Sequence, residues 1–196
     1  MQRPSTRLMK EYDLIKKFKE AGIGAIFNLQ QPREHTGCGD GLDPNSDFSY
    51  VPEDWMEAGI SYLQYGWVDM DTPNCELILS AVQLMSYMIA SGKKVAVHCH
   101  AGLGRTGLLI ASYLIFDKNM TPLEAQQLVR LARPGSIQNK KQTAFLGIFE
   151  NYLTKLRFYY PQMVMSGIMS TPAQTFLDIL QNQSICLHGK EERKLR

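Results

Sequence analysis

One segment constrains the fold of this sequence more than any other: residues 98–107 are His-Cys-His-Ala-Gly-Leu-Gly-Arg-Thr-Gly. The apolar run Lys94–His98 that leads into it predicts a short buried strand, and residues 106–116 predict a helix. A glycine-rich turn between a strand and a helix gathers backbone N–H groups and the helix N-terminus around one point. The segment therefore predicts an anion-binding loop inside a layered α/β domain.

Two side chains give this loop a reaction chemistry. A cysteine at the mouth of such a site experiences positive potential, so the thiol of Cys99 is expected to ionise more readily than a free cysteine. Arg105 carries a planar guanidinium that can bind two phosphate oxygens at once. Phosphoryl transfer needs in-line positioning and charge neutralisation, and this loop could supply both. The residues expected to surround the phosphate are His100, Ala101, Gly102, Leu103, Gly104 and Arg105.

The segment resembles the signature of cysteine-based protein tyrosine phosphatases, in which His-Cys is followed by five residues, Arg, and Ser or Thr. Residues 108–111 (Leu-Leu-Ile-Ala) and 133–137 (Arg-Pro-Gly-Ser-Ile) make it similar to the dual-specificity, Cdc14-like branch. The resemblance covers about residues 3–160. It implies transfer of a phosphoryl group to Cys99, hydrolysis of the phosphocysteine, and no metal or other cofactor.

The family needs a general acid on a loop ahead of the signature, and residues 67–73 occupy that place. The Cdc14-like pattern has its acid four residues before a proline, here Pro73, which assigns the role to Asp69. Such an acid protonates the leaving oxygen and then takes a proton from water. Asp71 is the alternative, and it could instead be a carboxylate favoured by the helix dipole near Thr72. Thr72 and Pro73 are expected to begin the next helix as its cap and first residue.

Three further residues have a family role and a purely structural alternative. Thr106 could donate a hydrogen bond to the Cys99 sulfur, or be a helix N-cap, or both. The resemblance gives His98 a supporting, orienting role, although a histidine at the end of a buried strand is more often a core residue. Gln142 aligns with a glutamine that positions the attacking water, but it could equally be an exposed first-turn residue. Gln138 is a weaker candidate for that role.

The sequence around Cys99 also suggests a metal site, formed by His98, Cys99 and His100, with His35 and Cys38 as further ligands. Neighbouring residues on a strand point in opposite directions, so three adjacent side chains do not easily converge on one ion. We therefore expect no metal ion here. His100 is expected to face outward, where it could contact substrate.

Strand-like and helix-like segments alternate along the chain, which predicts an α/β domain. With the resemblance, the predicted architecture is the protein tyrosine phosphatase fold: a central mixed β-sheet flanked by helices and lacking N-terminal edge strands. Strands are expected at 25–29, 60–67 and 94–98, and helices at 8–18, 72–91, 106–116, 121–133 and 139–159. Residues 30–52 are expected to form a long loop, in which Arg33, Glu34 and His35 are more simply solvated than part of the substrate cleft. Residues 1–160 would form the phosphatase domain, and 161–196 the start of a C-terminal extension with a helix at 171–187.

Composition excludes several other classes. The chain has 21 Lys and Arg against 19 Asp and Glu, and the basic tail 190–196 accounts for the whole net charge of +2. A nucleic-acid-binding protein is usually far more basic. No run approaches the roughly 18 apolar residues that cross a bilayer, so no membrane insertion is expected. The four cysteines are sparse, which favours a reducing compartment such as the cytoplasm. The resemblance alone adds an association with centrosome or cilium.

Three functions remain open at this level. The first is a phosphatase acting on phosphorylated proteins, of tyrosine or dual specificity. The second is a phosphate-binding adaptor without turnover, but such modules usually lose one of the residues corresponding to Cys99, Arg105 and Asp69. The third is a phosphoinositide phosphatase, whose loops tend to carry lysines that are absent between Cys99 and Arg105. The sequence does not fix the oligomeric state or the preference for phosphotyrosine over phosphoserine and phosphothreonine.

Overall fold

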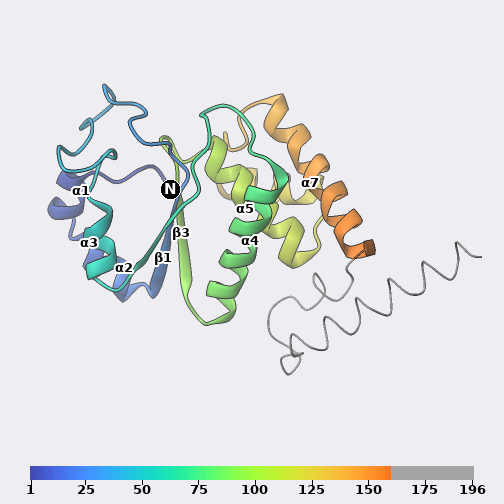
Figure 1. Cartoon of the computed structure of the whole chain (residues 1–196), viewed down its shortest axis with the longest axis horizontal. Coiled ribbons are helices and arrows are strands. Elements are labelled where there is room, and N and C mark those ends of the chain that lie inside the picture. The colour runs from blue at the N-terminus through green and yellow to red at the C-terminus, as the bar shows by residue number, and fades with distance from the viewer. Residues whose placement is uncertain (160–196) are drawn as a thin grey trace, which may run out of the picture.

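Three short strands form the centre of the fold (Figure 1). The structure is a computed structural model that describes residues 1–159. Its sheet has the order β2-β1-β3, with β1 at Ile23–Asn28, β2 at Ser61–Gln64 and β3 at Lys94–His98. The central strand β1 pairs in parallel with both neighbours, and Asn28 is opposite Gln64 on one side and His98 on the other. The carboxyl ends of all three strands therefore lie at one edge, where ligands bind in open α/β sheets.

The described sheet is parallel and not mixed, and its connections explain this. Parallel neighbours need a crossover that returns the chain to the starting edge, usually through a helix. The connection from β1 to β2 includes α3 (Pro52–Glu57), and the connection from β2 to β3 includes α4 (Cys75–Ala90). Antiparallel partners, which would make the sheet mixed, are absent from residues 1–159.

Helices cover both faces of the sheet. On one face lie α1 (Thr6–Glu11), α2 (Leu14–Glu20) and α3, and on the other lie α4, α5 (Gly104–Lys118), α6 (Pro122–Ala132) and α7 (Lys140–Tyr159) (Figure 1). Neighbouring strand residues point to opposite faces. Phe27 and Val97 accordingly belong to the larger core under α4–α7, whereas Ile26 and Ala96 belong to a smaller core that contains Trp55. Burial on both sides explains why these strands are apolar without alternation.

The N-terminal helical segment is interrupted, although its spacing predicts one helix. Asp13 lies between α1 and α2 with a left-handed backbone (φ 48°). Aspartate tolerates this conformation better than most residues because its short side chain can bond locally. The apolar periodicity still identifies the buried face on both sides of this interruption, since Met9 from α1 and Phe18 from α2 both pack on the smaller core.

The helix expected to begin at Thr72 and Pro73 begins later, at Cys75. The side chain of Asn74 accepts a hydrogen bond from the N–H of Leu77 at 2.7 Å, so Asn74 is the N-cap. Residues 67–73 are therefore free to form the loop that carries Asp69. The short helix α3 was not predicted, because six residues with Trp55 as their buried member show no clear periodicity. The helix expected from residue 121 is confirmed: Thr121 and Glu124 form a capping box that begins α6.

Two expectations concern residues that the structure does not describe. The extension at 161–196 and its helix at 171–187 lie outside the described residues, so the division into a domain and an extension stays a prediction.

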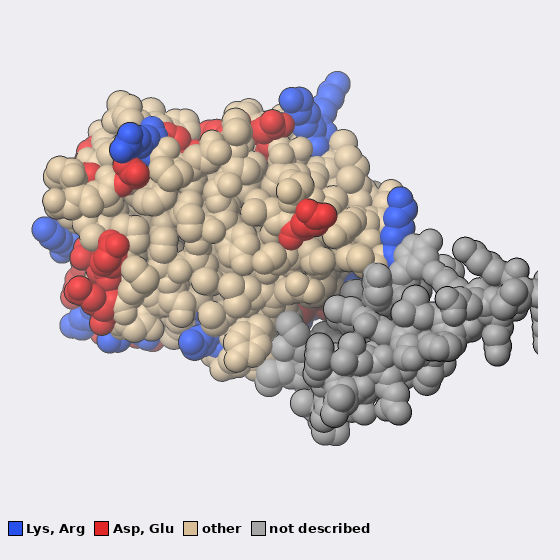
Figure 2. Space-filling model, in the orientation of Figure 1, with Lys and Arg blue, Asp and Glu red and all other residues tan. Residues whose placement is uncertain are grey.

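Among the described helices, none combines the length and apolar character needed to cross a membrane. Figure 2 shows acidic and basic side chains scattered over one face of the domain, and the described part of this face has no extended basic patch.

Candidate active site

The segment between β3 and α5 forms a tight loop at the carboxyl edge of the sheet. Gly102 has a left-handed backbone (φ 72°), and a Cβ at this position would lie 2.2 Å from the backbone of Met1. Helix α5 begins at Gly104, two residues before the expected start. A Cβ on Gly104 would lie 2.7 Å from Gln138 Oε1 and 3.1 Å from Gln142 Nε2. Glycine at both positions lets the loop curl and lets the start of α7 approach it.

Cys99 lies buried at the start of this loop, with 3% of its surface exposed. The hydroxyl of Thr106 donates a hydrogen bond to Cys99 Sγ at 3.2 Å. This bond fixes the position of the sulfur beside the first turn of α5. Thr106 is a buried residue of the first turn, and the N-cap position is Leu103, so the N-cap interpretation of Thr106 is wrong.

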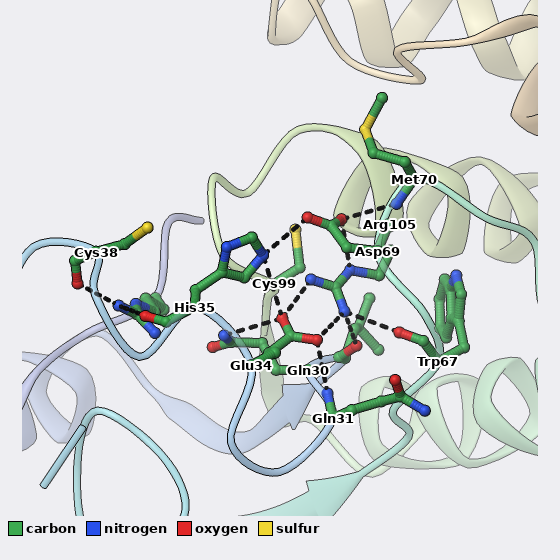
Figure 3. A network of polar contacts seen from close by, with 12 residues as sticks. Gln30, Gln31, Glu34, His35, Cys38, Trp67, Asp69, Met70, Cys99 and Arg105 are labelled. Carbon is green, nitrogen blue, oxygen red and sulfur yellow. Dashed lines mark hydrogen bonds and ion pairs between the residues drawn. The ribbon is translucent and has the colours of Figure 1, made fainter. Parts of the chain in front are cut away.

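Arg105 is fully buried, and two sides of its guanidinium are held by protein groups (Figure 3). Its Nη1 donates to the carbonyl oxygens of Leu29 at 3.0 Å and Trp67 at 2.8 Å. Glu34 accepts from Nη1 at 2.8 Å through Oε2 and from Nη2 at 2.5 Å through Oε1. Burial alone would lower the pKa of Arg105, but the hydrogen bonds and charge of Glu34 outweigh it and raise that pKa. The fork is thus fixed in orientation and always charged.

Glu34 is the residue that sequence reasoning missed, because it was expected to be solvated. Its side chain is only 15% exposed, and it also accepts hydrogen bonds from Gln30 Nε2 at 3.1 Å and Gln31 N at 3.0 Å. Burial alone would raise the pKa of Glu34. The hydrogen bonds and the charge of Arg105, with these other donors, outweigh burial and lower that pKa, so the carboxylate stays ionised. Arg33 fits the expectation, since it is exposed and pairs with Asp47 at 2.8 Å.

The two candidate acids have different surroundings. Asp69 Oδ1 lies 3.2 Å from Arg105 Nε, and its Oδ2 lies 2.9 Å from His35 Nε2 (Figure 3). Asp71 instead lies 3.7 Å from the exposed Lys141 Nζ. The structure therefore brings Asp69, and not Asp71, to the Cys99 loop. The catalytic role of Asp69 stays a prediction.

The loop that carries Asp69 is anchored on both sides. Met70 has a left-handed backbone (φ 60°), and its N–H donates to Asp69 Oδ1 at 2.9 Å. The carbonyl of Met70 accepts from Asn139 Nδ2 at 2.8 Å, and the indole of Trp67 donates to the carbonyl of Asp71 at 3.2 Å. These bonds fix the loop to itself and to the residue that precedes α7.

The two histidines beside Cys99 point to different surroundings. His98 is completely buried, and its Nε2 lies 2.7 Å from the hydroxyl of Tyr50. Burial lowers the pKa of His98 to about 3, so its ring is neutral near pH 7. His100 belongs to the loop, is partly exposed, and stacks on His35 with ring centroids 3.9 Å apart. Burial and the charge of His35 lower the pKa of His100.

Gln142 is fully buried, so its interpretation as an exposed helix residue is wrong. Its Oε1 accepts from the N–H of Gln138 at 2.9 Å, and its own N–H donates to Asn139 Oδ1 at 2.9 Å. Its Nε2 is buried and finds no hydrogen-bond partner in the described part of the chain. Because that amide lies against Gly104, it offers a spare donor to a ligand or water in the loop. Gln138 also approaches Gly104, but it is exposed.

The fold and the site together define a class of protein. A Cys-x5-Arg-Thr loop at the carboxyl edge of a parallel sheet, facing a carboxylate on the loop after β2, is the arrangement of a cysteine-dependent phosphatase. Residues 1–119 match the family model described as polymorphic toxin system, DSP-PTPase phosphatase. The chain belongs to this family of dual-specificity and tyrosine phosphatases.

Individual relatives agree with this assignment. The chain is 42% identical over 196 residues to protein tyrosine phosphatase domain-containing protein 1 of Mus musculus, which covers 100% of this chain and 26% of that protein. It is 34% identical over 93 residues to tyrosine-protein phosphatase CDC14 of Saccharomyces cerevisiae, covering 47% of this chain and 17% of that one. The chain spans about a quarter of the length of the curated relatives it matches over its whole length. These matches confirm the resemblance to the Cdc14-like branch.

Solved structures confirm the fold class. The crystal structure of Tk-PTP in the active form matches with a TM-score of 0.62 and 25% identity, covering 76% of this chain and 88% of that one. The protein therefore has the protein tyrosine phosphatase fold and is classed as a tyrosine or dual-specificity phosphatase.

Proposed function

We propose that this domain hydrolyses phosphate monoesters on proteins through a phosphocysteine intermediate on Cys99. The observation that carries the proposal is the convergence on one loop of a buried thiol, a fixed guanidinium and a carboxylate. Cys99 Sγ accepts from Thr106 at 3.2 Å, and Asp69 lies 3.2 Å from the guanidinium of Arg105. The three groups supply a nucleophile, a phosphate anchor and an acid, which are the roles that transfer to a thiolate requires.

In the first step, the thiolate of Cys99 attacks phosphorus, and the bond from phosphorus to the leaving oxygen breaks. The loop amides and Arg105 neutralise the charge on the other phosphoryl oxygens. The Nε of Arg105 makes no hydrogen bond within the described residues and is paired there with Asp69 alone, at 3.2 Å, so phosphate can take that position. A phosphate bound there would replace Asp69 at Arg105 Nε and leave the Asp69 carboxyl free to protonate the leaving oxygen.

In the second step, water attacks the phosphocysteine, the phosphorus–sulfur bond breaks, and inorganic phosphate is released. Asp69 takes the proton from this water, so it ends the cycle in the protonated state that the next turnover needs. The free Nε2 of Gln142 is suited to orient that water, and the hydroxyl of Thr106 stabilises the departing thiolate. Neutral His98, bonded to Tyr50, fixes the strand end that positions Cys99.

A phosphorylated protein is the substrate class that the site favours. The side chains on either side of Asp69, Val68 and Met70, are 55% and 49% exposed, and they offer apolar contacts to a peptide. The loop between Cys99 and Arg105 holds no lysine for the extra phosphates of a phosphoinositide. We place the protein in the cytoplasm, because a free, working thiol needs a reducing compartment. An association with centrosome or cilium rests on the resemblance alone.

The test is hydrolysis of an aryl phosphate by the purified protein in the presence of a chelator. Wild type and Cys75→Ser, which removes a cysteine outside this loop, should both turn over, and Cys99→Ser should be inactive. Phosphotyrosine and phosphoserine peptides and a phosphoinositide, compared under the same conditions, identify the substrate class. A wild-type protein that binds phosphate but releases none from any substrate would support the adaptor function instead.

A further inference from the structure

Three side chains outside the reacting groups gather at the mouth of the site. His35 and Cys38 come from the loop after β1, and His100 comes from the Cys99 loop. One nitrogen from each ring and the sulfur of Cys38 all lie within 4.8 Å of one another. A cavity of about 270 Å³ opens onto Cys38 and His100, so the cluster can be reached from solvent.

The expectation of no metal ion rests on the three adjacent residues 98–100, although the sequence also suggests His35 and Cys38 as further ligands. His98 turns toward Tyr50, on the face of the sheet opposite to Cys99, as alternation along a strand requires. His100 is released from that constraint because it lies beyond the end of β3, within the loop. Two distant residues, His35 and Cys38, then supply the ligands that adjacent residues cannot.

The chemistry of the three donors matches a zinc ion. Imidazole nitrogen and thiolate sulfur are the usual zinc ligands, and three protein ligands with one water make an open site. Donor atoms on one tetrahedral zinc lie about 3.4–3.7 Å apart, so the cluster must contract by about 1 Å. The stacked rings have planes only 13° apart, and one ring must rotate because a metal lies in the plane of each ring that binds it. That rotation uses a side-chain torsion with a broad, shallow energy profile.

A second observation points to a ligand at His100. Its Nδ1 is buried and has no hydrogen-bond partner among residues 1–159. A buried polar atom without a partner is costly, and a ligand on this ring would offset the cost. The neighbouring Arg3 holds the loop by donating to the carbonyls of His35 at 3.2 Å and Cys38 at 2.6 Å. Its positive charge opposes a cation, and the charge of the Cys38 thiolate compensates for it.

One ligand of the cluster is connected to the proposed acid. His35 Nε2 lies 2.9 Å from Asp69 Oδ2. A histidine that binds a metal through one nitrogen commonly donates its other N–H to a carboxylate, which fixes the ring. Asp69 would then be an acceptor held by His35, unable to carry a proton to the leaving oxygen.

We propose that His35, Cys38 and His100 bind Zn²⁺, and that the bound ion inhibits the phosphatase reversibly by holding Asp69 through His35. Binding releases the thiol proton of Cys38, because the thiolate is the ligand. The binding half of this inference is independent of the proposed function, whereas the inhibitory half rests on it.

Direct binding is tested with Co²⁺ as a spectroscopic probe, in the Cys99→Ser protein so that the reactive thiol cannot contribute. A thiolate-to-cobalt absorption band should develop on titration, and added Zn²⁺ should remove it. The further change Cys38→Ser should abolish the band, and the matched change Cys75→Ser should leave it intact. A band that persists without Cys38, or none in the Cys99→Ser protein, would overturn the site.

Inhibition is tested on the protein with Cys99 intact, by titrating Zn²⁺ against aryl phosphate hydrolysis. Losing even an outer-shell partner weakens a zinc site by about 10–100-fold, so Cys38→Ser should need at least about tenfold more Zn²⁺ for half inhibition. Cys75→Ser should behave as wild type. Equal inhibition of all three proteins would place the ion on Cys99 and overturn the regulatory half. A wild type without turnover would overturn the proposed function, and the cobalt result would stand.

Discussion

Glu34 holds Arg105 by both terminal nitrogens, at 2.8 Å through Oε2 and 2.5 Å through Oε1, although 71 residues separate them in the chain. The guanidinium is completely buried, so this carboxylate is the counter-charge that lets it remain inside the protein. The pair connects the loop after β1 to the first turn of α5. It therefore stabilises the fold and orients the phosphate-binding group at the same time.

Changing Glu34 to Ala should destabilise the protein by about 3 kcal/mol, the low end for breaking a buried pair, because one edge of the pair is solvated. Affinity for phosphate or vanadate should fall as well, since Arg105 loses its orientation. Urea unfolding and vanadate inhibition measure the two effects. The control Arg33→Ala removes an exposed ion pair, so it should leave stability almost unchanged. Equal effects of the two changes would contradict this role for Glu34.

Changing Asp69 to Asn should lower kcat by about 10²–10⁴-fold, the contribution of a general acid. The loss should be larger for alkyl than for nitrophenyl phosphates, because a good leaving group needs less protonation. The basic limb of the kcat profile should also disappear. Asp71→Asn should keep that limb, since its carboxylate lies beside Lys141. The pH profiles of both variants on both substrates decide between the two acids.

Changing Thr106 to Val keeps the shape of the residue and removes the donor to Cys99 Sγ. The sulfur is then a poorer leaving group, so hydrolysis of the phosphocysteine should slow more than its formation. Rapid-mixing experiments should show a burst of phenol release that wild type lacks, and Thr106→Ser should behave as wild type. A variant that is slow without a burst would indicate that the hydroxyl acts in the first step.

His98 should make the stability of the protein depend on pH. Its pKa falls from 6.5 to about 3 on burial, so below pH 6.5 the unfolded state binds a proton that the folded state does not. The free energy of unfolding should therefore decrease as the pH falls from 6.5 toward 3, by up to about 1.4 kcal/mol per pH unit from this residue. Denaturant titrations across this range should show a shallower slope for His98→Gln. Parallel slopes for the two proteins would mean that the folded protein protonates His98 normally.

The parts of the site that sequence predicted are those encoded in contiguous residues. The strand, the glycines, Cys99 and Arg105 lie within about a dozen positions, and Asp69 has a fixed spacing to Pro73. The role of Glu34 was not predicted, because it depends on a contact with Arg105 across the fold. The sequence around a charged residue in a polar loop does not indicate such a contact. The start of α4 was misplaced for a different reason, because the cap at Asn74 outcompeted the nearby Thr-Pro pair.

The pairing of Asn28 with His98 has a consequence for how inactive relatives of this protein could arise. It sets the level at which two loops leave the sheet, one carrying Glu34 and the other Cys99. A slip of one residue between β1 and β3 would exchange the faces of the slipped strand and shift the two loops by about 3.3 Å. Glu34 would then no longer contact Arg105, although every residue of the signature would be unchanged. A substitution in the apolar strands can therefore abolish the activity of such a domain without changing any residue of its catalytic motif.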